Sequence, residues 1–380
     1  MKYFIIAGEA SGDLHGSNLM RALKAKDADA EFRFLGGDFM KAEAGEPLIH
    51  LKQLAFMGFI PVLFHLRTIL HNMALTKEAI RLFHPDAVIL IDYPSFNLRI
   101  ARFVKQHFKI PVYYYISPKI WAWKTFRIKE IKHCIDAVLA IFPFEVEFYR
   151  QYDYFNVYYV GNPLMDAIPD ADAITVDKES FFKNNRFDDR PIVALLAGSR
   201  QKEIRDNLPL MLSVIPHYPQ YQFVIAGAPG IDKLFYDAFL TTNVEVKIVF
   251  NQTYDLLKTA FAAIVTSGTA TLETALFHVP QIVVYHLTPA RITPLLRKWI
   301  IKIPYISLVN IIAQKQVVVE LIGAEVTTRR LVDELKQITD NEAFRSNMLS
   351  EYNVIQHTLG ARGASERAAA KILALLKPSA

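Results

Sequence analysis

Residues 3–7 (YFIIA) run directly into residues 8–13 (GEASGD), and a helical pattern of apolar residues follows over 14–23. A buried strand that turns through glycines into a helix points backbone N–H groups at the turn, which suits a phosphate or a carboxylate. The second half of the chain repeats this layout, because residues 262–265 (AAIV) lead into residues 266–271 (TSGTAT) before another helical pattern. The two turns predict two halves of the nucleotide-binding type, while a purely structural use of either turn stays open.

Short apolar runs alternate with helical patterns along both halves, an order that favours parallel sheets covered by helices on both faces. The sequence therefore predicts an α/β fold with two Rossmann-like domains. In the first half we expect strands over 3–7, 31–35, 87–91, 112–116, 137–140 and 157–159, and helices that include 97–107 and 124–133. In the second half we expect strands over 192–196, 223–226, 244–249, 263–265 and 282–285.

A stretch rich in Asp, Asn and Lys separates the two halves, and we expect the linker near residues 161–174. The predicted N-terminal domain covers residues 1–165 and the predicted C-terminal domain covers residues 166–360. Residues 361–380 contain an Ala-rich helical pattern over 362–376. Two placements stay open for that helix, one against the N-terminal domain and one against a partner subunit.

The composition limits the class of protein. The 380 residues are 52% apolar. The sequence contains no uncharged window of about 18 apolar residues, so it predicts no transmembrane helix. Cys134 is the single cysteine, so we expect no disulfide within the chain and no thiol-based metal site, and a cytosolic location fits. The spacing of the His and Cys residues indicates no metal site, and we expect no cofactor. The net charge of +5 is unevenly distributed, because residues 93–129 and 274–319 contain no Asp or Glu. This asymmetry indicates an anionic partner, and no recognised nucleic-acid-binding motif accompanies it.

Asp92 ends the apolar run 87–91 and begins the segment 92–97 (DYPSFN). Ligands of open α/β sheets bind outside the carboxyl ends of the strands, which is where we expect Asp92. A carboxylate at that edge can accept the proton of a hydroxyl group as its oxygen attacks. In the alternative interpretation, Asp92 or Asn97 caps the helix that follows.

Two turns of the second half carry groups that suit a phosphate. In the first, Gly198 lets the backbone approach a ligand, Ser199 is expected to cap a helix, and Arg200 can hold a phosphate through two N–H groups. The second turn, residues 266–271, adds hydroxyl groups at a helix start, and Glu273 lies where it can accept bonds from ribose hydroxyls. Ordinary helix capping with solvated charges is the alternative for both turns.

Two segments have the composition of a membrane-binding surface. Residues 56–70 are too apolar on every side for an ordinary surface helix, and residues 291–302 form a basic amphipathic pattern. Insertion into a bilayer and attraction to anionic headgroups explain such segments, and burial between domains or subunits is the alternative. The residues assigned to this surface are Phe59, Ile60, Val62, Leu63, Leu66, Ile69, Arg297, Lys298, Trp299 and Lys302.

Nine short motifs together resemble the lipid-A-disaccharide synthases, a family of bacterial glycosyltransferases, over nearly the whole chain. The resemblance implies the GT-B architecture, in which two Rossmann-like domains face each other across a cleft. It also implies transfer of a diacylglucosamine from its UDP conjugate to a second diacylglucosamine 1-phosphate, forming a β-1,6 linkage and releasing UDP. The motifs are residues 7–13 (AGEASGD), 54–58 (LAFMG), 91–97, 117–123 (SPKIWAW), 142–145 (FPFE), 161–166, 198–200, 267–273 and 307–310.

The resemblance also implies roles for single residues. Asp92 matches the family's proposed general base, and residues 60–66 match the segment that meets the membrane and the acyl chains. The residues that match the donor UDP region are Gly198, Ser199, Arg200, Ser267, Gly268, Thr269, Glu273 and Asn310. On the acceptor side we expect Glu9, Ser11, Asp13, Asn97 and Trp121, although Trp121 and its neighbour Trp123 are equally compatible with core positions.

Three positions depart from the family's pattern. Ser95 stands where the family often has a second acid, so any role of that acid is absent here. Asn162 replaces a frequent His, and Ala197 replaces the usual Pro, which alters loop detail. The absence of metal-ligand spacing agrees with GT-B enzymes, which stabilise the leaving diphosphate with Arg side chains and helix N-termini in place of Mg²⁺.

These observations predict two lipid substrates, UDP-diacylglucosamine and diacylglucosamine 1-phosphate, and an anionic membrane surface as partners, with no nucleic acid. The expected location is cytoplasmic and peripheral, on the inner face of the bacterial inner membrane, and a homodimer is left open. Two other functions stay open as well. One is an enzyme similar to UDP-N-acetylglucosamine 2-epimerase with a soluble substrate, and the other is a peripheral lipid-binding protein without catalytic activity.

Overall fold

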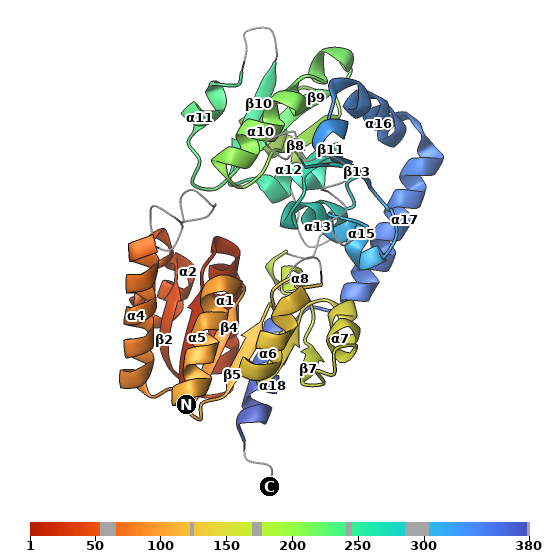
Figure 1. The fold of residues 1–380 in the computed structure, drawn as a ribbon. Coiled ribbons are helices and arrows are strands. Elements are labelled where there is room, and N and C mark those ends of the chain that lie inside the picture. Colours follow the sequence, from red (N-terminus) through yellow and green to blue (C-terminus); the bar gives the residue numbers. More distant parts are fainter. Residues whose placement is uncertain (54–65, 122–124, 169–176, 241–244, 286–303, 378–380) are drawn as a thin grey trace. The chain divides into compact units, whose positions relative to one another are not determined.

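The computed structural model describes residues 1–53, 66–121, 125–168, 177–240, 245–285 and 304–377. The chain forms two compact units, coloured along the sequence in Figure 1. Unit 1 comprises Met1–Ala167 and Leu359–Ala380, and unit 2 comprises Ile168–Thr358. The last segment of the chain therefore returns to the unit in which the chain began.

Unit 1 is built on a seven-stranded sheet in the order β3-β2-β1-β4-β5-β6-β7, and every neighbouring pair of strands is parallel. The inner strands β1, β4, β5 and β6 are almost entirely buried and apolar, as expected of a sheet covered on both faces. The strands are β1 (Lys2–Ala7), β2 (Glu31–Gly36), β3 (Ile49–His50), β4 (Ala87–Ile91), β5 (Val112–Tyr115), β6 (Ala137–Ala140) and β7 (Val157–Tyr159).

Helices cover both faces of this sheet (Figure 1). Side chains alternate between the faces along each strand, so Phe4 and Ile6 pack with α4, α5, α6 and α7, whereas Tyr3 and Ile5 pack with α1, α2 and α18. The helices are α1 (Ala10–Lys24), α2 (Asp38–Ala44), α4 (Leu66–Phe83), α5 (Pro94–His107), α6 (Ile128–Cys134), α7 (Pro143–Arg150), α8 (Leu164–Ala167) and α18 (Ala364–Leu376), with short 3₁₀ turns η1 (Leu51–Gln53) and η2 (Thr125–Arg127).

Helix α18 is fixed to unit 1 by polar contacts at its start. The Asp166 carboxylate accepts hydrogen bonds from the backbone N–H groups of Gly363 (2.7 Å), Ala364 (3.2 Å) and Ser365 (3.1 Å). These N–H groups have no partner within the helix, so Asp166 stabilises its N-terminus. Arg367 donates to the carbonyl of Val160 at 2.8 Å, which adds a second attachment. The 161–166 motif thus ends in a residue that anchors the chain's last helix.

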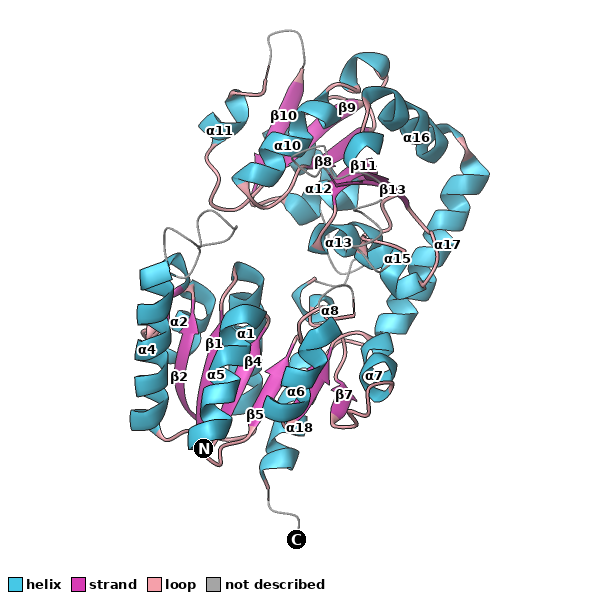
Figure 2. Ribbon diagram, viewed as in Figure 1, coloured by secondary structure: helices cyan, strands magenta, loops and turns pink. Residues whose placement is uncertain are grey.

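Unit 2 repeats the architecture with a six-stranded sheet in the order β10-β9-β8-β11-β12-β13, again parallel throughout (Figure 2). Its strands are β8 (Ile192–Leu196), β9 (Gln222–Gly227), β10 (Val246–Phe250), β11 (Ala260–Thr266), β12 (Gln281–Tyr285) and β13 (Val319–Ile322). Its helices are α9 (Lys178–Asn184), α10 (Gln201–Leu212), α11 (Lys233–Asp237), α12 (Thr253–Thr259), α13 (Thr269–Leu276), α15 (Leu308–Ala313), α16 (Thr328–Asp340) and α17 (Glu342–Leu359), with 3₁₀ turns η3 (Ile215–His217) and η4 (Gly323–Glu325).

Both sheets therefore have the Rossmann-type strand order, and the predicted α/β class with two such domains is confirmed. The order reverses between β1 and β4 in unit 1 and between β8 and β11 in unit 2. Ligands of such sheets bind outside the carboxyl ends of the strands at this reversal. Four turns follow these four strands, and each of them contains predicted site residues.

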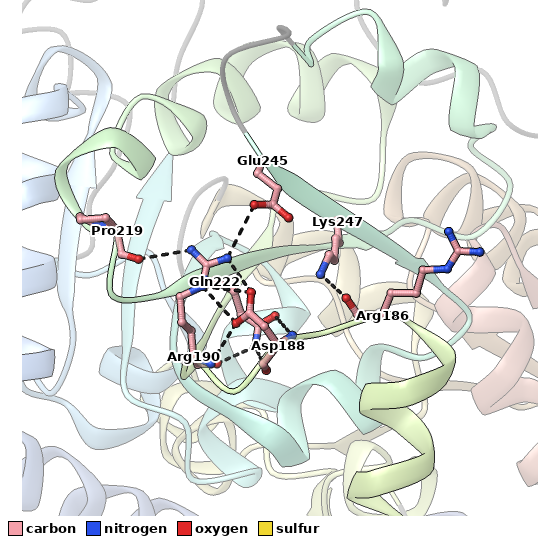
Figure 3. A network of polar contacts seen from close by, with 7 residues as sticks. All are labelled: Arg186, Asp188, Arg190, Pro219, Gln222, Glu245 and Lys247. Carbon is pink, nitrogen blue, oxygen red and sulfur yellow. Dashed lines mark hydrogen bonds and ion pairs between the residues drawn. The ribbon is translucent and has the colours of Figure 1, made fainter.

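A polar network closes the opposite, amino edge of the unit 2 sheet (Figure 3). The Arg190 guanidinium binds both oxygens of Asp188, at 3.0 and 2.6 Å, and donates to the carbonyl of Pro219 at 3.2 Å. Gln222, the first residue of β9, donates to the carbonyls of Asp188 and Arg190 at 2.7 and 2.5 Å. The Arg190 side chain holds the pKa of the Asp188 carboxyl below its usual value. These groups satisfy one another, so we assign the network a structural role.

Several sequence-based bounds differ from the structure by one to three residues, including those of β10 and β11, and three further differences have a clear physical reason. Strand β5 ends at Tyr115 because Ile116 has a φ of 58°, which no strand residue adopts. The helix predicted over 124–133 is a 3₁₀ turn followed by α6 from Ile128. Strands β3 and β13 were not predicted. They pair only at the outer edge of each sheet. Strand β3 is two residues long, and Glu320 interrupts the apolar run that contains β13.

Candidate functional site

The backbone at the end of β4 is held in a strained conformation. Asp92 and Tyr93 have φ values of 44° and 49°, and Ile116 at the end of the neighbouring strand has 58°. Left-handed conformations cost about 1–3 kcal/mol each in residues other than glycine, and they cluster at functional sites. The N–H of Asp92 donates to the carbonyl of Ile116 at 3.2 Å, so the two strained turns support each other.

Two side chains hold the Asp92 backbone in this conformation. The Tyr114 hydroxyl donates to the Asp92 carbonyl at 2.7 Å, and the Asn97 amide donates to the same oxygen at 2.6 Å. Burial raises the pKa of Tyr114 well above its ordinary value, so this hydroxyl stays protonated and remains a donor. Helix α5 has Tyr93 as its N-cap, and that cap makes no side-chain hydrogen bond. The backbone of Asp92 is thus held in place at the carboxyl edge of the sheet, and its side chain is partly exposed there.

The glycine turn after β1 is closed by Tyr93. A Cβ atom on Gly8 would lie 2.2 Å from Cγ of the Tyr93 ring, so only glycine fits beneath this ring. Burial raises the pKa of the Tyr93 hydroxyl, and the charge of Glu9 raises it further, which places Glu9 near that ring. Ser11 is exposed in the first turn of α1. Glu9 and Ser11 are thus the polar side chains of this turn that solvent can reach.

Two of the predicted acceptor-side residues are occupied by internal contacts. The buried Asp13 carboxylate accepts bonds from the N–H groups of Gly37, Phe39 and Met40 at 2.7–3.0 Å and thereby caps α2. The buried Asn97 amide donates to the carbonyls that end β4. Both residues shape the carboxyl edge, and their contact with an acceptor stays a prediction.

A buried carboxylate organises the turns after β5 and β6. Glu145 accepts hydrogen bonds from the N–H groups of Ile141 (3.0 Å) and Phe142 (3.1 Å), from the indole N–H of Trp121 (3.2 Å) and from the Ser117 hydroxyl (3.4 Å). Burial raises the pKa of the Glu145 carboxyl, and these four donors lower it. Glu145 therefore fixes the partly exposed Trp121 ring at the carboxyl edge. The sequence motif contained Glu145, but its partner is 24 residues away and no local pattern indicates it.

In unit 2, the turn between β8 and α10 is closed by Glu203. Its carboxylate accepts bonds from the Ser199 N–H at 2.9 Å and from Arg200 Nη1 at 3.4 Å. Gly198 has a φ of 125°, and a Cβ there would lie 2.5 Å from Cβ of Glu203, so the position requires glycine. The expectation that Ser199 caps the helix is wrong, because Arg200 is the N-cap of α10. The extended backbone conformation of an N-cap occurs one residue later than predicted, at Arg200.

Among the described residues, nothing covers the turn between β11 and α13. A Cβ atom built on Gly268 meets nothing within 4 Å, and Thr269 is exposed at the first position of α13. The Ser267 hydroxyl donates to the carbonyl of Ile306 at 3.1 Å. Burial raises the pKa of the Glu273 carboxyl, while the Tyr254 hydroxyl, which donates to it at 3.2 Å, lowers it. Tyr254 orients Glu273 and was not identified from the sequence.

Asn310 is fully buried in α15 and uses its whole amide internally. Its oxygen accepts from the N–H groups of Val317 and Val318 at 2.7 and 2.9 Å, and its nitrogen donates to the carbonyl of Val318 and to Glu320. Glu320 also accepts bonds from the N–H and the hydroxyl of Ser307. Asn310 thus shapes the segment between α15 and β13, and a direct contact with UDP stays a prediction.

Most of the predicted membrane surface lies outside the described residues. This holds for Phe59, Ile60, Val62, Leu63, Arg297, Lys298, Trp299 and Lys302. Leu66 begins α4, and Ile69 is partly exposed on the same helix beside Leu70, which is 53% exposed. Within the described ranges, every helix is too short or too polar to span a bilayer. In the same ranges, no group of three or more His, Cys, Asp or Glu side chains is placed to hold a metal ion.

Comparison with known proteins gives one consistent family. Residues 3–373 match the model of the lipid-A-disaccharide synthetase family. The chain is 36% identical to the lipid-A-disaccharide synthase of Myxococcus xanthus (99% of this chain, 98% of the relative) and 37% identical to that of Syntrophus aciditrophicus (99% and 98%).

Among solved structures, the UDP-GlcNAc 2-epimerase of Neisseria meningitidis bound to UDP-GlcNAc superposes with a TM-score of 0.65 at 13% identity, covering 94% of this chain and 99% of that one. This likeness concerns the fold alone, so the epimerase-like alternative is reduced to a fold relationship. The predicted GT-B class agrees with it. The sequence matches, by contrast, extend over nearly the full length at above 30% identity, and on that ground the chain belongs to the lipid-A-disaccharide synthetase family.

Proposed function

We propose that this chain is a metal-independent glycosyltransferase that joins UDP-2,3-diacylglucosamine and 2,3-diacylglucosamine 1-phosphate. The 6-hydroxyl oxygen of the acceptor attacks the anomeric carbon of the donor, the bond from that carbon to the diphosphate breaks, and UDP leaves. The product is the β-1,6-linked disaccharide 1-phosphate. The family membership and the relatives' printed names support this reaction class.

In this proposal Asp92 is the general base. Its carboxylate accepts the proton of the acceptor's 6-hydroxyl as the new bond forms, and one base is sufficient for a single displacement with inversion. The observation that carries the assignment is the strained backbone of Asp92 and Tyr93, which Tyr114 and Asn97 hold in place at the strand-order reversal. Ordinary helix capping would not require this conformation.

Unit 2 binds the UDP part of the donor in this proposal. Arg200 and the N–H groups at the start of α13 stabilise the negative charge that develops on the leaving diphosphate, which is a role that Mg²⁺ has in other enzymes. Glu273 accepts hydrogen bonds from the ribose hydroxyls, with Tyr254 orienting its carboxylate. Activity is therefore expected to survive EDTA.

The substrates carry acyl chains, so we further propose that the protein acts at an anionic membrane surface, peripherally on the inner face of the bacterial inner membrane. The uneven charge supports this location, because 93–129 and 274–319 contain basic residues and no acidic ones. The homodimer stays a prediction, and sedimentation measurements test it.

The deciding experiment incubates the purified protein with both lipid substrates, measures UDP release and identifies the product by mass spectrometry. We expect a disaccharide 1-phosphate and stoichiometric UDP. Conversion of UDP-N-acetylglucosamine to its epimer would support the epimerase-like alternative. Binding to vesicles without any turnover of the two lipids would support the non-catalytic alternative.

A further inference from the structure

A groove of about 820 Å³ lies in unit 1 between α5 and the segment formed by η2 and α6. It is unlike an ordinary helix contact because half of its ten lining residues are Arg or Lys, while the stems of these side chains and two apolar neighbours form its walls. The lining residues are Arg102, Lys105, Gln106, Phe126, Arg127, Lys129, Glu130, Lys132, His133 and Cys134.

Several of these cations are already neutralised or used elsewhere. Arg102 pairs with Glu130 at 2.7 Å, and Lys105 pairs with Asp136 at 2.7 Å. Lys132 donates to the carbonyl of Tyr152 at 2.8 Å. The two ion pairs neutralise Arg102 and Lys105, whereas Lys132 keeps its charge but its ammonium group is bound to a backbone carbonyl.

Arg127 and Lys129 are different. Arg127 Nη2 donates to the hydroxyl of Ser95 at 3.0 Å, which is a neutral partner and leaves the positive charge uncompensated. Within the ranges that the structure describes, neither Arg127 nor Lys129 forms an ion pair. A guanidinium has five N–H donors, so the contact with Ser95 leaves most of them available. The η2–α6 end of the groove thus offers two cations to an anion.

The Arg127 side chain connects this end of the groove with the turn that carries the candidate base. Ser95 lies three residues after Asp92 in the first turn of α5. Tyr114 connects the two places as well: its hydroxyl bonds to the Asp92 carbonyl, and although burial raises the pKa of that hydroxyl, the nearby charge of Arg127 lowers it. Arg127 therefore lies close to the carboxyl ends of β4 and β5.

We propose that Arg127 and Lys129 form the binding site for the phosphomonoester of the acceptor sugar. A phosphomonoester carries nearly two negative charges at neutral pH, Arg can bind it through two parallel N–H groups, and Lys adds a point charge. The acceptor has its phosphate at C1 and its attacking hydroxyl at C6. Binding the phosphate at Arg127 therefore orients the sugar with the opposite end of the ring toward Asp92. This inference rests on the proposed function and adds a specificity determinant to it.

The main test combines variants with an altered substrate. Wild type, Arg127→Gln and Lys129→Gln are assayed with the phosphorylated acceptor and with the same lipid lacking the phosphate. For Arg127→Gln we expect kcat/KM to fall about 10- to 100-fold with the phosphorylated acceptor, which corresponds to one lost charge-assisted contact. With the dephosphorylated lipid it should stay within about twofold of wild type. Lys129→Gln should give the same pattern with a smaller loss.

The matched control is Lys109→Gln, which removes an exposed cation beyond the end of α5 and outside the groove. It should change neither reaction, and UDP affinity should be unchanged in all variants. An equal loss with both acceptors would overturn the proposal, because Arg127 would then act on the fold or on Asp92. Unchanged kinetics combined with weaker binding to vesicles containing anionic lipid would overturn it in favour of a headgroup site.

A second measurement does not require activity. Glucosamine 1-phosphate, as a soluble probe, should bind to wild type in calorimetry, more weakly to both variants and normally to Lys109→Gln. If wild type binds this probe but transfers no sugar, the phosphate site stands and the proposed function fails. If wild type transfers sugar but the variants bind the probe as it does, the phosphate site fails and the proposed function stands.

Discussion

The turn after β1 and the turn after β11 come from similar stretches of sequence but are used in opposite ways. In unit 1, Gly8 is covered by the Tyr93 ring, and Asp13 is consumed in capping α2. In unit 2, no atom of the described residues lies within 4 Å of a Cβ position on Gly268, and Thr269 is exposed. A glycine after a buried strand therefore indicates that another group packs closely against the backbone. The surrounding chain determines whether that group is a side chain, as at Gly8, or a ligand.

This difference between the two turns indicates which step of the reaction each unit serves. In unit 1 the neighbouring turn after β4 supplies the covering ring and, one residue earlier, the candidate base Asp92. In unit 2 neither turn at the strand-order reversal covers the other. Glu203 closes the turn after β8, and no described residue covers Gly268 in the turn after β11. We therefore expect changes in the unit 1 turns to affect turnover or stability, and changes in the unit 2 turns to affect UDP affinity.

Replacing Asp92 with Asn should have the largest effect. The substitution preserves the shape of the side chain but removes its basicity, so kcat should fall about 10²- to 10⁴-fold, while UDP affinity and thermal stability stay near wild type. The matched control is Asp86→Asn at the amino end of the same strand, where Asp86 accepts a bond from the N–H of Lys2 at 2.7 Å. Near-normal turnover of Asp92→Asn would remove Asp92 as the base.

His15 on α1 should make unit 1 sensitive to acid. Burial lowers the pKa of its imidazole to about 4, although Asp166 opposes this, and Nδ1 has no hydrogen-bond partner among the described residues. The unfolded chain, with a His pKa near 6.5, binds more protons between pH 4 and 6.5. Stability should therefore fall by about 2–3 kcal/mol as the pH falls through that window.

Urea unfolding of wild type and His15→Gln from pH 4 to 7.5 tests this, with the exposed His357→Gln of α17 as the control. The stability of His15→Gln should depend less on pH than that of wild type, and the control should follow wild type. Parallel curves for all three proteins would show that His15 titrates normally.

Arg200→Ala should weaken UDP binding without affecting the fold. One charge-assisted contact with a diphosphate corresponds to an increase of about 10- to 100-fold in Kd. Lys202→Ala is the control, because Lys202 pairs with Asp206 at 2.6 Å along α10. Calorimetry with UDP gives both values. Equal affinities for the two variants would mean that the first turn of unit 2 does not contact the diphosphate.

The sequence predicts those strands whose own residues form a recognisable apolar run. Strands β4, β6, β7 and β8 have the predicted bounds because each is a continuous apolar run between polar segments. The end of β5 was wrong because the left-handed Ile116 depends on a hydrogen bond from Asp92, 24 residues earlier. No window along the chain contains both residues.

The same limit applies to the candidate site. Asp92 and Arg200 were identified because each follows a strand in a recognisable turn. The roles of Glu145, Tyr254 and Glu320 were missed because they are set by partners elsewhere: Trp121 for Glu145, Glu273 for Tyr254 and Ser307 for Glu320. Charged or hydroxyl groups that orient another residue leave no periodic pattern, so only the fold identifies them.

The two glycines allow a direct test of the opening comparison. Gly8→Ala places a methyl group into the Tyr93 ring, which should destabilise unit 1 by about 1–3 kcal/mol and lower kcat, because Tyr93 follows Asp92 directly. Gly268→Ala meets open space and an extended backbone, so stability should change by less than about 0.5 kcal/mol. Its UDP affinity should fall, because the methyl group occupies the proposed path of the ligand. If Gly8→Ala is as stable and active as wild type, the closed turn is not closed in solution.

Glu145→Gln should have the smallest effect on turnover and a specific spectroscopic one. A Gln side chain offers one acceptor oxygen where Glu145 offers two, so either the pair of backbone N–H groups or the Trp121 indole loses its acceptor. We expect a loss of about 1–3 kcal/mol in stability, a shift in tryptophan fluorescence and a few-fold rise in the acceptor KM at similar kcat. The control is Glu147→Gln, an exposed residue of the same helix α7. A stability loss without any change in fluorescence or KM would mean that Glu145 only caps α7 and that Trp121 does not contact the acceptor.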